Sequence, residues 1–141
     1  MSTKLGYPAR SALLPVQAAI YARLDAGLSV PIYDYVDENA PYPYVTVGEA
    51  TEVDDNTHDT FGREVTHTLH VWSKGRQGFA EVLSIADEIT RLLDHDQNEL
   101  VVAGHRVVSV HLDQILTMRD PDPLIRHAPV RFRVNTEQVQ P

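Results

Sequence analysis

Histidine is the residue type in this 141-residue chain most able to do chemistry, because imidazole can ligate a metal ion or carry a proton near neutral pH. The chain has no cysteine that could add a thiolate ligand or a thiolate nucleophile. Its histidines are His58, His67, His70, His95, His105, His111 and His127. The first question is therefore whether their spacing suits a metal site.

The spacing of the histidines does not match a local metal-binding motif. His67 and His70 are three residues apart in a segment with strand character, so their side chains should point to opposite faces. The expected helices contain no pair of histidines four residues apart. A site drawn from separate strands, for example from His70, His111 and Asp113, is the alternative that stays open. We expect hydrogen-bonded or exposed histidines and no resident metal or other cofactor.

Motifs for nucleophilic catalysis and for nucleotide binding are also missing from the sequence. Ser73 lies in WSKG, and no G-x-S-x-G elbow occurs that would expose a serine nucleophile. Neither G-x-G-x-x-G nor G-x-x-x-x-G-K-[ST] is present, and GRQG at 75–78 is expected only to lead into a helix. A protein without an active site is expected. The alternative is a small enzyme or ligand-binding domain that uses His70 and His111.

The charged residues favour protein contacts over a grip on nucleic acid. The net charge is −8, with 20 acidic and 12 basic residues, whereas binding to a phosphate backbone needs clustered Lys and Arg. The most acidic stretch is 52–61, which we interpret as a contact loop rather than a solvated connection. Its aspartates are Asp54, Asp55 and Asp59.

Two arginines near the end of the chain could hold an acidic partner. Arg131 and Arg133 alternate with apolar residues in the last expected strand, so both should point outward. The acidic loop of a neighbouring copy would be a suitable partner. A solvated strand edge is the alternative interpretation.

The elements that must position these residues begin with a central strand. From Val65 to Trp72 the side chains alternate between two faces, with His67 on one face and His70 on the other. The period then becomes helical, which predicts a helix over Phe79–Leu93 whose apolar face includes Leu83. On its exposed face, Glu88 and Arg91 are expected to form an ion pair. An earlier helix should run from about Leu13 to Gly27, with a face of Leu13, Gln17, Ile20 and Leu24. Further strands are expected at 31–36, 42–49, 105–112 and 126–134.

Together these elements predict an α+β fold. Residues 1–141 should form one domain in the order α-β-β-β-α-β-β, with two helices packed on a mainly antiparallel sheet. Residues 1–10 and 137–141 are expected to be loosely ordered. We expect no secretory signal and no membrane span.

Several blocks of sequence follow one another from about Leu13 to about Glu137. They are AAIYARL at 18–24, IYD at 32–34, APYPYVTVGE at 40–49, HVWS at 70–73, GFAEV at 78–82 and RDPDPLIRHAPVRFR at 119–133. Taken together, these blocks resemble the family of small tail-completion proteins of long-tailed phages, prophages and gene transfer agents, which includes tail terminator and head-tail joining proteins. The YPYVTVGE and HVWS blocks are the most specific. The chain departs from the family pattern after Asp120, where Pro121 and Pro123 stand in a turn that more commonly carries Gly.

The resemblance implies a structural component of the particle rather than an enzyme. Such a protein forms a ring, most often a hexamer, which caps the tail tube at its head-proximal end and joins it to the head connector. The implied partners are other copies of the chain, the tail tube protein and a connector or stopper protein, with DNA only passing through the lumen. The implied location is the bacterial host cytoplasm during assembly and then the neck of the particle. A soluble adaptor that binds one partner without ring closure is the alternative.

Overall fold

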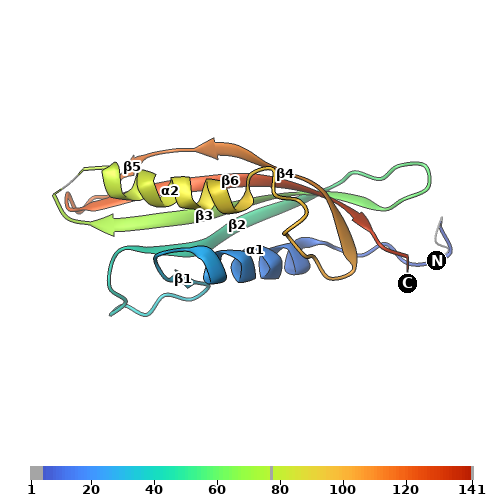
Figure 1. Ribbon diagram of the computed structural model, residues 1–141, viewed down its shortest axis with the longest axis horizontal. Coiled ribbons are helices and arrows are strands. Elements are labelled where there is room, and N and C mark those ends of the chain that lie inside the picture. Colours follow the sequence, from blue (N-terminus) through green and yellow to red (C-terminus); the bar gives the residue numbers. More distant parts are fainter. Residues whose placement is uncertain (1–4, 77, 141) are drawn as a thin grey trace.

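The computed structural model describes residues 5–76 and 78–140, so residues 1–4 of the expected arm and residue 141 lie outside the described residues (Figure 1). It confirms the α+β fold and the predicted order of elements, with a short additional strand, β5. The elements are α1 (Leu13–Gly27), β1 (Ile32–Tyr33), β2 (Tyr44–Asp54), β3 (Gly62–Lys74), α2 (Ala80–Leu93), β4 (His105–Ile115), β5 (Met118–Arg119) and β6 (Ile125–Gln138).

The strands form one sheet in the order β1-β2-β3-β6-β4, and β5 also pairs with β6. All pairings are antiparallel except that of β1 with β2, which is parallel. β3 pairs with β6 along its whole length, from Gly62 opposite Glu137 to Lys74 opposite Ile125. β3, the strand predicted to be central, therefore lies in the middle of the sheet.

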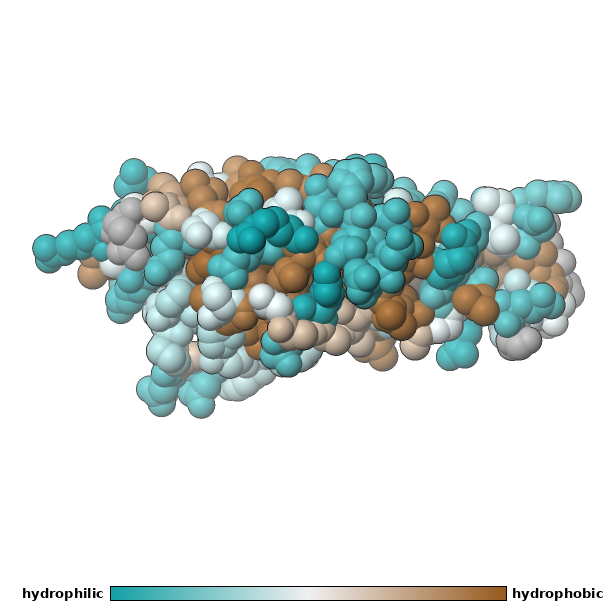
Figure 2. Space-filling view, in the orientation of Figure 1, coloured by the Kyte–Doolittle hydropathy of each residue, from teal (hydrophilic) through white to brown (hydrophobic). Residues whose placement is uncertain are grey.

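Both helices lie on the same side of the sheet (Figure 1), and the core lies between the two layers. The inward side chains of the two central strands are fully buried, among them Val65, Leu69 and Val71 of β3 and Val130 and Phe132 of β6. Figure 2 shows the helix side, where hydrophilic residues lie among smaller apolar areas. Neither helix within the described ranges is long and apolar enough to cross a membrane.

The helix faces differ from the prediction in detail. In α1, Val16 is buried in place of the predicted Gln17, together with Ile20 and Leu24. In α2, Ile85 is buried and the predicted Leu83 is 43% exposed. In both cases the predicted residue is one or two positions away from the side of the helix that meets the sheet.

The predicted ion pair between Glu88 and Arg91 on α2 is wrong. Arg91 Nε instead donates to Asp87 Oδ2 at 3.0 Å, the i,i+4 partner one full turn away. Glu88 accepts hydrogen bonds from the backbone N–H and the hydroxyl of Ser29, and so ties α2 to the segment after α1.

Two bulges in β4 change which way its side chains point. Strict alternation along the strand predicted at 105–112 puts Val108 on the same side as Val110 and Leu112, but the register shifts between Val107 and Ser109 and leaves Val108 44% exposed. A second shift lies between Leu112 and Gln114. A bulge adds one residue to one strand of a pair, so simple alternation fails across it.

The acidic connection is shorter than the sequence indicated, because β2 continues to Asp54 and β3 begins at Gly62. The last strand is longer than predicted and includes two residues of the expected tail, ending at Gln138. The side chain of Gln138 is bonded to the backbone of Pro8 and of Arg10. The described part of the N-terminal arm is thereby attached to the end of β6.

Candidate functional site

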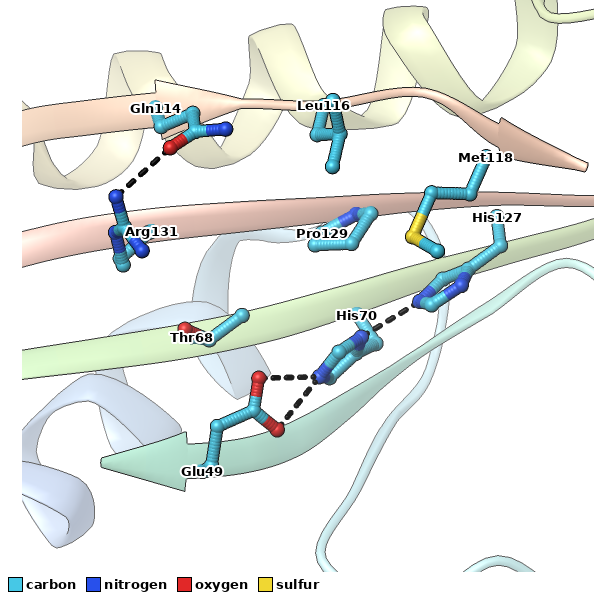
Figure 3. Close-up of a pocket in the computed structure, with 9 residues that line it drawn as sticks. All are labelled: Glu49, Thr68, His70, Gln114, Leu116, Met118, His127, Pro129 and Arg131. Atoms are coloured by element: carbon cyan, nitrogen blue, oxygen red, sulfur yellow. Dashed lines mark hydrogen bonds and ion pairs between the residues drawn. The ribbon is translucent and has the colours of Figure 1, made fainter.

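The face of the sheet opposite the helices is uncovered in the single chain, and it carries an open groove (Figure 3). β3 and β6 contribute their outward side chains to it, and the segment around β5 forms one wall. The lining residues are Glu49, Thr68, His70, Gln114, Leu116, Met118, His127, Pro129 and Arg131. We call this set the open-face groove.

Two histidines meet in this groove because of the register between the central strands. Trp72 of β3 lies opposite His127 of β6, and His70 lies opposite Pro129, so His70 and His127 are diagonal neighbours. Their nearest ring nitrogens, His70 Nδ1 and His127 Nε2, are 2.6 Å apart. The ring of His127 also stacks on Trp72, with centroids 3.9 Å apart and planes 3° from parallel.

Glu49 completes a chain of hydrogen bonds with the two histidines. His70 Nε2 lies 3.1 Å from Glu49 Oε2. A neutral His70 that donates from Nε2 to the carboxylate has Nδ1 free to accept from His127 Nε2–H, and this assignment satisfies the whole chain. Burial lowers the pKa of His127, and repulsion from His70 in its protonated state lowers it further. A hydrogen bond to its own backbone N–H and the bond to His70 lower the pKa of Glu49.

A bulge in β2 brings Glu49 to this position. The register of β2 against β3 shifts between Val47 and Ala50. Gly48 lies in this bulge, and a Cβ built there would stand 2.8 Å from the Thr68 carbonyl oxygen and even closer to the His70 ring. Only glycine allows the backbone to approach His70 this closely.

This network is suited to holding side chains in place, because its members are bonded to one another. The described residues that line the groove include no serine or cysteine that the histidines could activate. The only hydroxyl among them belongs to Thr68. Both nitrogens of His70 are occupied, by Glu49 and by His127. The stacked Trp72 and His127 form a rigid flat surface beside this chain.

The apolar end of the groove has the character of a protein contact. Leu116 and Met118 remain 45% and 44% exposed, and they lie beside Pro129 and His127 (Figure 3). Exposed apolar side chains next to a rigid aromatic pair are typical of residues that become buried when a partner docks.

The structure does not bring His70 and His111 together. His70 is opposite Pro129 and His111 is opposite Arg133, with β6 between β3 and β4. Four residues along a strand correspond to roughly 13 Å. The third residue of the alternative metal site, Asp113, is instead engaged by arginines, so this combination of ligands is not assembled.

The predicted contact arginines already have partners within the chain. Arg131 Nε and Arg133 NH2 both donate to Asp113, at 2.7 Å and 2.8 Å. Arg133 Nε also lies 3.5 Å from Glu64. The two arginines lower the pKa of Asp113 through these hydrogen bonds. A neighbouring acidic loop would have to compete with these contacts.

The predicted acidic residues lie at the tip of the β2–β3 hairpin, which projects beyond the helices near the chain ends (Figure 1). Asp54, Asp55 and Asp59 are all exposed. Asp54 accepts from the Asn56 N–H and Asp59 from the Thr57 hydroxyl, both within the tip, whereas Asp55 accepts from the Asn135 side chain of β6 at 3.0 Å. The carboxylates therefore face solvent in the single chain.

Sequence reasoning missed most of the groove. His127, Trp72 and Met118 were not selected as site residues, although the alternation of β3 and of the last strand indicated that the first two point outward. The missing information was the register between β3 and β6, which decides which outward residues touch.

Comparison with known proteins identifies the family. The model of the family "Tail completion protein gp17" matches residues 11–137. The chain belongs to this family. The predicted resemblance to tail-completion proteins is thereby confirmed, and its expected span of about Leu13 to Glu137 agrees with the match.

Individual relatives agree with this assignment. The chain is 30% identical to tail completion protein gp17 of Bacillus phage SPP1 over 97 residues, which cover 67% of this chain and 69% of that protein. The solved structure of bacteriophage SPP1 gp17 has a TM-score of 0.51 at 19% identity and covers 91% of this chain and 92% of its own. A chain of the native gene transfer agent virion has a TM-score of 0.75 at 21% identity, covering 92% of this chain and 99% of that one. Both of these solved structures share the fold of this chain.

Proposed function

We propose that this protein is a non-enzymatic virion component that forms a closed ring, caps the tail tube and joins it to the head connector. The observation that carries the proposal is the family match across residues 11–137. Its partners in this proposal are other copies of itself, most simply six, the tail tube protein and a connector or stopper protein. The ring assembles in the host cytoplasm and then occupies the neck of the particle.

We also propose that the open face of the sheet is a subunit interface in this ring. A closed ring needs two different surfaces on each subunit that fit one another. The open-face groove offers exposed Leu116 and Met118 beside a rigid stacked pair, and it therefore supports one of these surfaces. The helix side also exposes apolar residues, Leu14 of α1 and Leu83 of α2, but among hydrophilic residues and without a stacked ring pair within the described helices.

The substitution Met118→Asp tests this interface. Met118 is exposed, so the isolated chain should keep its fold and its melting temperature. An unpaired carboxylate buried against a neighbouring subunit costs several kcal/mol, so rings and functional particles should be lost. Val101→Asp is the matched control, because Val101 is 81% exposed and lies outside the groove.

Particle yield in a complementation assay reports the result, with circular dichroism as the check on folding. Normal particles with Met118→Asp, or an equal loss with Val101→Asp, would reject the open face as an interface.

The acidic hairpin tip suits a position facing the DNA path. Carboxylates that line a lumen repel phosphates and keep the genome from adhering as it passes. The competing use, contact with Arg131 and Arg133 of a neighbour, receives less support because Asp113 already holds both arginines. Removal of the three charges separates the two uses.

A further inference from the structure

Three metal-ligating side chains lie together at the free edge of β4, apart from the open-face groove. Asp94, His95 and His111 each offer one donor atom, and these atoms all lie within 4.8 Å of one another. The rings of His95 and His111 meet edge to face, with centroids 4.6 Å apart. Two imidazoles and a carboxylate are the donor set typical of zinc and related divalent ions.

Backbone contacts hold this cluster in place. The N–H of His95 donates to the carbonyl of Val110 at 2.8 Å. The N–H of Leu112 donates to Asp94 Oδ1, also at 2.8 Å. The turn after α2 is thus bonded to β4 on both sides of His111, which fixes the spacing between the two segments that supply the ligands.

The backbone at His95 is unusual for its residue type. His95 has φ 59°, in the left-handed region, and directly follows Asp94, the C-cap residue of α2. Glycine is the usual residue at such a position, because a Cβ disfavours this conformation. The adjoining Asp96 is paired with Arg23 of α1 at 2.6 Å, so the turn is anchored to the first helix as well. The chain therefore has a histidine at a position where glycine would adopt the backbone conformation at a lower energetic cost.

We propose that Asp94, His95 and His111 form a binding site for one divalent transition-metal ion, with zinc as the best-suited species. Zinc bonds to nitrogen and oxygen ligands are about 2.0–2.2 Å, so donors around a tetrahedral ion lie roughly 3.3 Å apart. The rings of His95 and His111 are exposed and can rotate to close the remaining distance. The open fourth position belongs to water or to a group from a partner.

The ion links the end of α2 to an edge strand. β4 is the last strand in the sheet order, so one side of it has no strand neighbour within residues 5–76 and 78–140. A bond from the turn to His111 would keep this edge covered and block unwanted strand pairing. The proposal departs from the expectation, based on sequence, that no histidine holds a metal. It does not depend on the proposed ring.

Calorimetric titration of the tag-free chain with zinc chloride tests the site. We expect one ion per chain and a rise in melting temperature that a chelator reverses. His95→Ala and His111→Ala should each weaken binding at least about tenfold. Asp94→Asn should weaken it too, while its amide oxygen still accepts the hydrogen bond from Leu112. His58→Ala is the control, because His58 is an exposed histidine in the hairpin tip, outside the cluster.

Several results would overturn the proposal. They are the absence of zinc binding to the wild type, unchanged binding in all three cluster variants, and an equal loss in His58→Ala. Binding that survives these variants and disappears in His127→Ala would place the ion in the open-face groove instead. Circular dichroism of each variant confirms that a loss of binding is not a loss of fold.

Discussion

At the scale of single residues, His67 is a polar side chain buried in the apolar core. Its side chain is on the inner face of β3 and is 1% exposed, and neither ring nitrogen has a hydrogen-bond partner among the described residues. Burial lowers the pKa of His67, and the adjacent Thr68 backbone and the Glu49 carboxylate offset this only in part. The ring is therefore neutral in the folded chain, at a cost in unsatisfied polar atoms.

The lowered pKa predicts how stability depends on pH. The unfolded chain takes up a proton on His67 below pH about 6.5, whereas the folded chain does not until a lower pH. Stability is therefore lost as pH falls below this value. Burial also lowers the pKa of His105 and of His127, so they add to the same trend. The melting temperature should fall between pH 7.5 and pH 5.5.

His67→Leu should raise stability by roughly 1 kcal/mol at pH 7.5, because it removes two unsatisfied nitrogens from the core and keeps a similar volume. It should also make the fall in melting temperature toward pH 5.5 shallower. Differential scanning calorimetry at several pH values provides the measurement, and His58→Gln serves as an exposed control. A destabilised variant, or one with the pH dependence of the wild type, would show that the His67 nitrogens are satisfied.

At the scale of elements, the β2–β3 hairpin carries the acidic residues that are proposed to face the DNA path. A Cβ added at Gly62 would overlap the carbonyl of Asp55, so glycine lets the hairpin tip close on the start of β3. The N–H of Asp55 donates to the Gly62 carbonyl at 3.0 Å. The tip is thus a defined arm with three exposed carboxylates rather than a loose connection.

Asp54→Asn, Asp55→Asn and Asp59→Asn in one chain should leave ring assembly intact and slow DNA delivery, if the tip faces the lumen. The control removes equal charge elsewhere, with Asp25→Asn, Asp34→Asn and Glu38→Gln, all exposed positions outside the tip. Particle counts and DNA-transfer titres are measured together. Weakened assembly would indicate neighbour contact instead, and normal results in both assays would make the tip a plain solvated connection.

The sequence was sufficient to predict elements whose pattern is regular. Alternation from Val65 to Trp72 and the helical spacing after Phe79 both gave the correct element and the correct buried side of β3. It failed where geometry depends on a partner strand, as at Val108, which the bulge in β4 turns outward. The pairing of His70 with His127 depends on register, which no local pattern contains.

At the scale of the whole molecule, the two sides of the sheet are unequal. The helices cover one side and form the core, whereas the other side displays Trp72, His127 and the exposed apolar residues of the groove. In the proposed ring, a neighbouring subunit covers this open face. The resemblance in sequence predicted the family but not the proposed contact surface, because that surface combines residues from five strands and the segment between β4 and β5.

The most direct test is cryo-electron microscopy of particles that contain this chain. We predict a closed ring of this protein at the head-proximal end of the tail tube. In this ring the open-face groove, with Met118 and the Trp72–His127 pair, should be buried against the next subunit, and the hairpin tips should point toward the lumen. A chain located elsewhere in the particle would contradict the proposed function. A ring in which the open-face groove faces solvent would contradict the proposed subunit interface.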